Sequence, residues 1–301
     1  MTYASALALL KKNGQEQVLR FWPKLTAAQR KALLAQIETF DFKALARMET
    51  LIKAPAAAPV KKATASAPDV AELKGAACAK AVVAGEKELR AGRVGVLLVA
   101  GGQGSRLGFN GPKGAFPIGP VTGEPLFYFH ARKVLALSIR YGHPIPFYIM
   151  TSEANNEATQ KCFEEHDFFG LNPDDVIFFT QGMWPGMTPD GKIILDAPGH
   201  VFMSPDGHGG TLAALKRSGA LADMKKRGVK SVFFFQVDNP MVEIADPAFI
   251  GYHVLNRSEY SCKLCAKRTP DEKVGMVVRR GDRFEMIEYT ELTPEMANRR
   301  R

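Results

Sequence analysis

The feature that most constrains this chain is the segment Val94–Gly108, where an apolar run leads directly into a glycine-rich loop. Val94–Val99 reads VGVLLV, which predicts a buried parallel strand. The next residues, AGGQGSRLG, hold four glycines within eight positions. Such a backbone can turn sharply and present successive N–H groups to an anion. Because Arg106 and Lys113 add positive charge close by, the segment predicts a nucleotide phosphate site.

Two familiar phosphate-binding loops do not fit this spacing. The P-loop requires Lys-Ser or Lys-Thr directly after its last glycine, and no glycine here is followed by that pair. The dinucleotide fingerprint Gly-x-Gly-x-x-Gly begins at Gly102 and Gly104, but Leu107 occupies the position of its third glycine. Neither of these two loops therefore accounts for the segment, and a glycine-rich turn without a ligand stays an alternative.

The order LVAGGQGSRLG followed by Pro112-Lys113 resembles the signature of the UDP-sugar pyrophosphorylases, and most of all their UDP-N-acetylglucosamine branch. Ser105 stands where that signature usually has threonine. The resemblance runs from Arg93 to the end of the chain. It implies the nucleotide-diphospho-sugar transferase fold, a Rossmann-like, mainly parallel mixed sheet flanked by helices. Family members continue past the last matching segment with a further sugar loop, a second phosphate-binding lysine and a C-terminal domain. We therefore expect a C-terminally truncated member.

The pattern of apolar residues supports the same α/β class independently. Apolar runs and amphipathic stretches alternate, which predicts a mainly parallel sheet with right-handed crossovers. Residues 231–237, SVFFFQV, are apolar on both faces and are expected at the centre of the sheet. The other expected strands are 94–99, 146–150 and 176–179, with antiparallel strands at 262–267, 275–278 and 284–289. The expected helices are 69–92, 124–142, one capped by Thr151 or Ser152 and running to 166, 209–228 and 247–255, with a further helix starting at Thr293-Pro294.

Three regions are expected along the chain. Residues 1–52 read as an N-terminal helical segment, with Thr26 and Asp41 as N-caps of two of its helices. Residues 53–68, KAPAAAPVKKATASAP, are rich in alanine, proline and lysine and predict a linker. Residues 69–301 would form the nucleotidyltransferase catalytic domain, with its C-terminal part missing.

Composition narrows the possible partners and compartment. A formal charge of +9 fits solvated basic faces or attraction to polyphosphates, whereas aromatic residues do not interleave with the basic runs as nucleic-acid binding would favour. The pair Cys262-x-x-Cys265 lacks a second pair at zinc spacing and is expected within a strand. Free cysteines suit a reducing compartment. The N-terminus lacks the basic-then-apolar order of a signal peptide, and no run reaches the about 20 apolar residues of a membrane span. We expect a cytoplasmic protein that binds neither nucleic acid nor membrane.

Four further segments match the family in the same order, and the resemblance assigns their roles. Gln181, after the third strand, would face the nucleotide base, since an amide both donates and accepts hydrogen bonds. Asp238, after the fourth strand, would hold Mg²⁺ and contact the nucleotide, since a carboxylate is a suitable ligand for a hard cation. Arg106 and Lys113 would be catalytic and act on the triphosphate. The remaining assignments are backbone contacts to the nucleotide from Ala100, Gly101, Gly102 and Gly207, and sugar contacts from His208, Glu288 and Tyr289.

The resulting hypothesis is a uridylyltransferase that joins UTP and a sugar 1-phosphate into a UDP-sugar and pyrophosphate. Gly207-His208-Gly209-Gly210 lies between the patterns of the glucose and N-acetylglucosamine branches, so both sugar phosphates stay open. Two alternatives also stay open: a non-catalytic nucleotide- or sugar-binding module, and a nucleotidyltransferase that uses another base. The sequence does not decide the oligomeric state.

Overall fold

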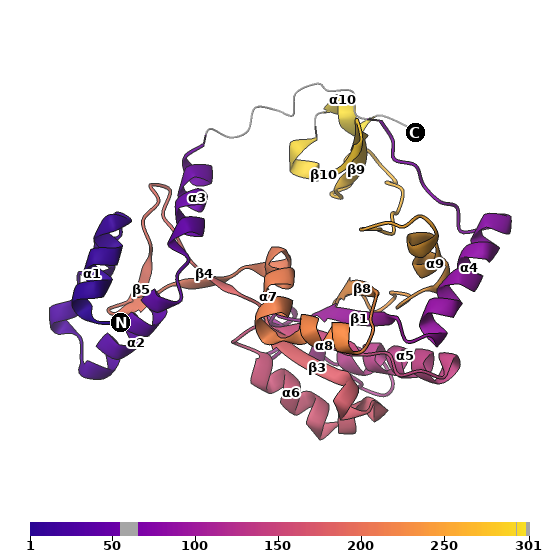
Figure 1. Cartoon of the computed structure of the whole chain (residues 1–301), viewed down its shortest axis with the longest axis horizontal. Coiled ribbons are helices and arrows are strands. Elements are labelled where there is room, and N and C mark those ends of the chain that lie inside the picture. The colour runs from indigo at the N-terminus through magenta and orange to yellow at the C-terminus, as the bar shows by residue number, and fades with distance from the viewer. Residues whose placement is uncertain (55–65, 293, 299–301) are drawn as a thin grey trace. The chain divides into compact units, whose positions relative to one another are not determined.

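The computed structural model describes residues 1–54, 66–292 and 294–298, and it divides into two compact units (Figure 1). The first unit comprises Met1–Glu72, Met187–Val201 and Ser261–Arg301, and the second comprises Leu73–Gly186 and Phe202–Tyr260. Most of the expected linker 53–68, and Thr293, lie outside the described residues. The three expected regions stay a prediction.

A parallel four-stranded sheet organises the second unit. Its order is β3 (Val176–Thr180), β2 (Phe147–Thr151), β1 (Val94–Val99) and β8 (Ser231–Gln236). All four strands lie close to their expected positions, and the α/β class is confirmed. Because the strands are parallel, the loops that follow them emerge at one edge of the sheet.

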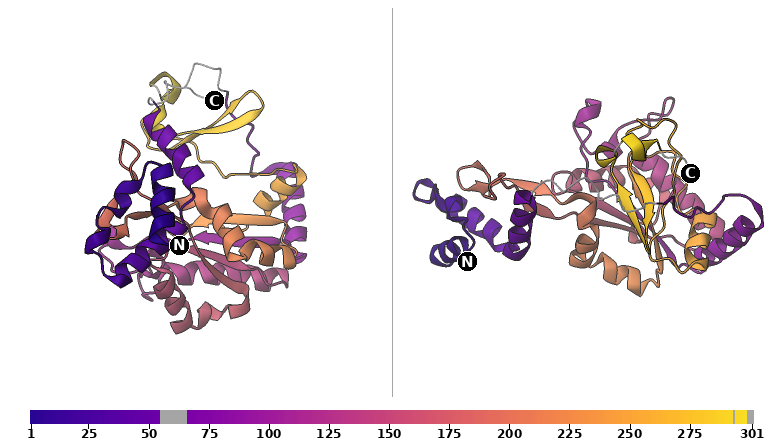
Figure 2. Two further views of the ribbon diagram at one scale, coloured as in Figure 1. Left: turned by 60° about the vertical axis from the view of Figure 1, so that its left-hand side comes forward. Right: turned by 90° about the horizontal axis from the view of Figure 1, so that it is seen from above.

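Helices cover both faces of this sheet, as Figure 2 shows. Val96 and Leu98 of β1 point into a core shared with α5 (Leu126–Tyr141) and α9 (Pro247–Leu255). Leu97 and Val99 point into a second core, shared with α7 (Thr211–Ser218) and α8 (Ala220–Lys226). This alternation explains why β1 is a continuous apolar run rather than an alternating one.

The expectation that β8 is central is wrong. In the part of the sheet that the structure describes, β8 pairs with β1 along one side and forms the edge. Its burial alternates: Phe233 and Phe235 are each 5% exposed, whereas Val232 is 41% and Phe234 45% exposed. Both faces of β8 carry apolar residues, but only one face is buried. Folded proteins also expose apolar side chains, so an apolar run alone does not show burial on both faces.

Other differences from expectation have local causes. Residues 209–228 form two helices rather than one, because Gly219 adopts a left-handed conformation with φ of +84°. The N-cap of α6 (Asn156–Glu165) is Asn155, not Thr151 or Ser152. The first helix of this unit, α4 (Gly75–Arg90), begins later than the expected 69. Residues 262–267 form no strand, and Cys262 and Cys265 are exposed, so that expectation is wrong too.

Elements of the first unit follow the sequence pattern closely. The helices are α1 (Tyr3–Lys12), α2 (Ala27–Glu38) and α3 (Phe42–Lys53), and Thr26 and Asp41 cap the last two as expected. Later in the chain, β9 (Met276–Arg280) pairs antiparallel with β10 (Arg283–Ile287) in a sheet of their own. A short helix, α10 (Pro294–Ala297), follows.

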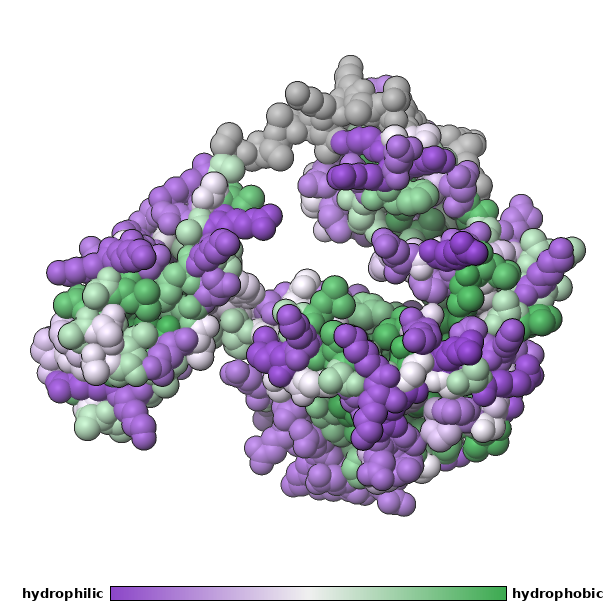
Figure 3. All heavy atoms as spheres, in the orientation of Figure 1, coloured by the Kyte–Doolittle hydropathy of each residue, from purple (hydrophilic) through white to green (hydrophobic). Residues whose placement is uncertain are grey.

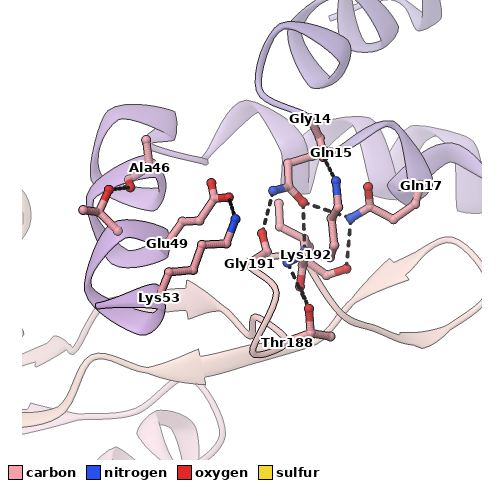
Figure 4. A network of polar contacts seen from close by, with 11 residues as sticks. Gly14, Gln15, Gln17, Ala46, Glu49, Lys53, Thr188, Gly191 and Lys192 are labelled. Atoms are coloured by element: carbon pink, nitrogen blue, oxygen red, sulfur yellow. Dashed lines mark hydrogen bonds and ion pairs between the residues drawn. The ribbon is translucent and has the colours of Figure 1, made fainter. Parts of the chain in front are cut away.

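A hairpin from the middle of the chain, residues 187–201, docks on these N-terminal helices within the first unit. It contains β5 (Leu195–Ala197) and β6 (His200–Val201). The buried amide of Gln15 donates to the carbonyl of Gly191 at 2.8 Å and accepts from the N–H of Ile193 at 2.9 Å (Figure 4). Gln36 makes the same two-way contact with the backbone of Val201. The side-chain amides thus make hydrogen bonds to the hairpin backbone that a neighbouring strand would otherwise make.

Polar and charged side chains dominate the face drawn in Figure 3, with smaller apolar areas between them. Among the described residues, none of the helices combines the length and apolar character required to cross a membrane.

Helices α4 and α9 pack so closely that glycine is required at their crossing. A β-carbon on Gly85 would lie 1.9 Å from the carbonyl oxygen of Pro247, and one on Gly251 would lie 1.7 Å from that of Ala81. Both obstacles are backbone atoms, which cannot move aside without shifting a helix.

Substituting either glycine by alanine should therefore destabilise the protein. On an exposed helix, Gly→Ala gains about 1 kcal/mol, whereas overpacking at this crossing should cost about 1–3 kcal/mol. Urea unfolding of Gly85→Ala and Gly251→Ala measures the change. Val83→Ala, at a position 70% exposed on the same helix, is the control and should stay within about 0.5 kcal/mol of the wild type. An unchanged Gly251→Ala variant would contradict the packing described.

Candidate functional site

The glycine-rich loop leaves the carboxyl end of β1 and folds back on itself. The N–H of Gly104 donates to the carbonyl of Gly111 at 2.9 Å, and the N–H of Lys113 donates to the carbonyl of Gly102 at 3.0 Å. These two bonds bring Lys113, eleven positions further along the chain, back beside the start of the loop. The chain between them makes a 3₁₀ turn at Ser105–Leu107, which carries Arg106.

Asn155 holds this loop from the sheet side, and sequence reasoning missed it. Its side chain is 1% exposed, and its Nδ2 donates to the carbonyls of Ala100 at 2.9 Å and Gly102 at 3.2 Å. Its Oδ1 accepts from the N–H of Ser152 at 2.8 Å. The amide thereby ties the ends of β1 and β2 together. The available signal was an asparagine just after a strand end, a pattern that also occurs in ordinary turns.

Lys113 and Asp238 meet at this edge of the sheet. The Lys113 Nζ lies 3.1 Å from the Asp238 Oδ2, although 125 positions separate the two residues. The contact forms because β1 and β8 are neighbours, with Val99 level with Gln236, so both following turns emerge together. Arg106 is exposed, and its guanidinium bonds to none of the residues in the described ranges. Its charge is therefore available to an anion.

Gln181 lies directly against the loop. It is 7% exposed. Its backbone N–H donates to the carbonyl of Thr151 at 2.8 Å, which continues the pairing of β2 and β3 by one residue. A β-carbon on Gly101 would lie 2.8 Å from the Gln181 Nε2, so a larger residue there would displace the Gln181 amide. The structure thus brings together Gln181 and the start of the loop.

The segment with Gly207 and His208 reaches Gln181 through a two-stranded ribbon. β4 (Met183–Pro185) pairs antiparallel with β7 (Met203–Pro205), and the N–H of Asp206 donates to the carbonyl of Gly182 at 2.9 Å. Gly207 is left-handed with φ of +59°. The His208 ring is exposed and lies 6.0 Å, centroid to centroid, from the ring of Phe234 on β8.

Glu288 and Tyr289 belong to the first unit and are described within it alone. They follow β10, and both are exposed. The Glu288 carboxylate caps the 3₁₀ turn Tyr289–Glu291, and Glu291 returns a bond to the N–H of Glu288 at 3.3 Å.

Comparison with known proteins places this geometry in a family. The model of the UTP–glucose-1-phosphate uridylyltransferase family matches residues 48–300. The chain belongs to that family.

Relatives from this family match nearly the whole chain. UDP-N-acetylglucosamine diphosphorylase 2 of Arabidopsis thaliana is 39% identical over 96% of this chain, and UDP-N-acetylhexosamine pyrophosphorylase-like protein 1 of Homo sapiens is 36% identical over 97%. The crystal structure of the UDP-N-acetylglucosamine pyrophosphorylase of Trypanosoma brucei, in complex with an inhibitor, superposes with a TM-score of 0.80 at 30% identity over 96% of the chain. This chain spans 61% of the length of each of these three proteins.

His130 is a second buried polar residue that supports the edge of the uridylyltransferase sheet. It is fully buried on α5, and its Nε2 donates to the carbonyl of Val237, the residue before Asp238, at 2.8 Å. The pKa of the imidazole is lowered from 6.5 to about 4, chiefly by burial; the charge of Lys133 also lowers it, whereas the hydrogen bond to Val237 and the charge of Asp238 partly oppose the shift. The ring is therefore neutral at physiological pH, and Nε2 carries its proton.

The low pKa of His130 predicts a pH-dependent stability. The unfolded chain takes up the proton near pH 6.5 and the folded chain only near pH 4, so the contribution is complete above 6.5 and declines as pH falls. Between pH 7 and pH 5, the loss should be about 2 kcal/mol. Urea unfolding at both pH values should show it in the wild type, with a fall smaller by that amount in His130→Gln, which keeps a donor but does not titrate. Equal falls in both proteins would contradict the assignment.

Asn155→Leu should destabilise the protein by about 1–3 kcal/mol, because it removes the side-chain donor to the carbonyl of Ala100 and one of the two donors to the carbonyl of Gly102. Chemical denaturation measures the effect. Asn256→Ala removes an exposed asparagine at the end of α9 and serves as the control, with a change within about 0.5 kcal/mol. Equal stability of the two variants would show that the Asn155 bonds do not hold the loop.

Proposed function

We propose that this chain carries the nucleotide site of a uridylyltransferase that makes a UDP-sugar and pyrophosphate from UTP and a sugar 1-phosphate. The observation that carries the proposal is the contact between Lys113 and Asp238 beside the glycine-rich loop. The contact puts a cation and a carboxylate beside the glycine backbone at the carboxyl edge of a parallel sheet, and Arg106 lies on the 3₁₀ turn of the same loop. Ligands of open α/β sheets bind at this edge.

Binding the triphosphate is the first task of such a site. The backbone N–H groups of Gly101 and Gly102, with Ala100 before them, would meet phosphate oxygens, as glycine-rich turns do. Arg106 offers a planar fork of donors, and Lys113 a point charge. Lys113 would exchange its contact with Asp238 for one with the substrate. Because one polyanion must approach another, the main chemical demand is to align them and offset their repulsion.

Asp238 suits a role at a magnesium ion. Its side chain is half exposed, it presents hard carboxylate oxygens, and it faces the cation assigned to the phosphates. Mg²⁺ is typically held by one or two carboxylates together with substrate phosphates, so a single aspartate at this position fits. When bound, Mg²⁺ would neutralise part of the triphosphate charge. In the reaction, a phosphate oxygen of the sugar 1-phosphate attacks the α-phosphorus of UTP in line with the departing pyrophosphate, without a covalent enzyme intermediate.

Gln181 is assigned to the base, because its amide can pair with both a donor and an acceptor on uracil. Gly207 would add a backbone contact to the nucleotide, and His208, Glu288 and Tyr289 are proposed to contact the sugar. The names of the relatives favour N-acetylglucosamine 1-phosphate as the first sugar to test. Glucose 1-phosphate is the second.

A non-catalytic module that binds UTP is the competing function. Because the chain spans 61% of its relatives, it could bind UTP without turning it over. Pyrophosphate release from UTP with each sugar 1-phosphate, and from the other nucleoside triphosphates, separates the possibilities. UTP-dependent release supports the enzyme. UTP binding without release supports a non-catalytic module, and release with another triphosphate supports a different base.

Arg106→Ala tests the proposed catalytic role. If the guanidinium stabilises the charge that develops during transfer, its loss should lower kcat on the order of a hundredfold. The rate of pyrophosphate release measures this. Arg140→Ala removes an exposed arginine on α5 and should leave the rate unchanged. Near-normal turnover of Arg106→Ala would remove Arg106 from the mechanism.

A further inference from the structure

One side of α5 contacts the back of the turn that carries Asp238. His130 donates to the carbonyl of Val237, and the ammonium of Lys133, one turn further along the helix, donates to the carbonyls of Pro240 and Val242. The bond to Val242 measures 3.1 Å. The two side chains thus contact one carbonyl before Asp238 and two after it.

Lys133 is in an unusual setting for a lysine. Its ammonium is partly buried and donates to main-chain oxygens, and burial lowers its pKa, although the charge of Glu243 partly offsets this. Placing a cation there carries a desolvation cost that an apolar side chain would avoid. An apolar side chain would fill the same volume without this cost. We therefore infer that the bonds from Lys133 serve to hold the shape of the turn.

The exposed side chain of Asp238 depends on that shape. The described contact of its carboxylate is with Lys113, whose own backbone is tied to Gly102. Within the turn the bonds are long, with Asn239 N–H to Gln236 and Val242 N–H to Asn239 both at 3.3 Å; at its start, the Val237 N–H donates to the Val99 carbonyl of β1 at 3.1 Å. Beyond Val237, the bonds from α5 are therefore a main restraint on the direction of the carboxylate.

We propose that His130 and Lys133 are positioning residues, which hold the turn 237–242 so that the Asp238 carboxylate stays aimed at Lys113 and at the metal-bound substrate. The inference rests on the proposed function for its metal, but the ordering of the turn can be measured without any substrate. Residues that orient a metal ligand typically change metal affinity by about 10–100-fold when they are removed.

The test compares Lys133→Met, which keeps the length of the side chain but removes the donor, with Lys133→Arg, which keeps a charged donor. Arg140→Met, on the exposed part of the same helix, is the matched control. Two quantities are measured on the full chain: hydrogen exchange of the amides in residues 237–242, and the Mg²⁺ concentration that gives half-maximal pyrophosphate release from UTP.

In Lys133→Met, we expect faster exchange at 237–242 and a Mg²⁺ requirement raised about tenfold, with kcat largely recovered at saturating Mg²⁺. Lys133→Arg should restore both quantities, and Arg140→Met should change neither. A merely structural lysine would lower the amount of folded protein without moving the Mg²⁺ requirement, and that outcome would overturn the proposal. Unchanged exchange at the turn would also overturn it. A wild type that releases no pyrophosphate would refute the proposed function, and the exchange comparison would still decide whether Lys133 holds the turn.

Discussion

The burial of β1 on both faces is the constraint on which the rest of the second unit depends. Val96 and Leu98 belong to one core and Leu97 and Val99 to the other, so no residue of this strand can carry a polar side chain into solvent. Functional groups must then come from the turns beyond the ends of the strands. The parallel pairing of β3, β2, β1 and β8 gathers the turns that follow these strands at one edge. The glycine loop, Gln181 and the turn of Asp238 lie there for that reason.

The sequence was most informative where one local rule applies. The apolar run of β1, the capping residues Thr26 and Asp41, and the bounds of α9 agree with expectation because each depends on neighbours within a few positions. It was least informative where a distant partner decides. β8 and the segment 262–267 both have strand-like composition. Whether such a segment finds a partner strand, and which of its faces is covered, depends on residues far away in the chain.

The same distinction applies to the candidate site. The residues named from the family signature include those that structure brings into contact, Lys113 with Asp238 and Gly101 with Gln181. The supporting residues Asn155, His130 and Lys133 carry no motif of their own. Each bonds to main-chain carbonyls of a loop more than 50 positions away, and any side chain with a suitable donor and length could serve. Such residues are visible only when the carbonyls they satisfy have been located.

The docking of the hairpin 187–201 has a consequence for how this sequence can change over time. The amides of Gln15 and Gln36 bond mainly to peptide groups, which every residue possesses, and Gln36 also contacts the ring of His200 at 3.3 Å. The hairpin is also held by the buried side chains of Ile193 and Val201, and its two left-handed glycines, Gly191 and Gly199, lie against Glu49 and Leu25 with little space for a larger residue. Related chains should accordingly retain the backbone geometry of the hairpin together with its glycines and its buried apolar positions, while its exposed positions vary.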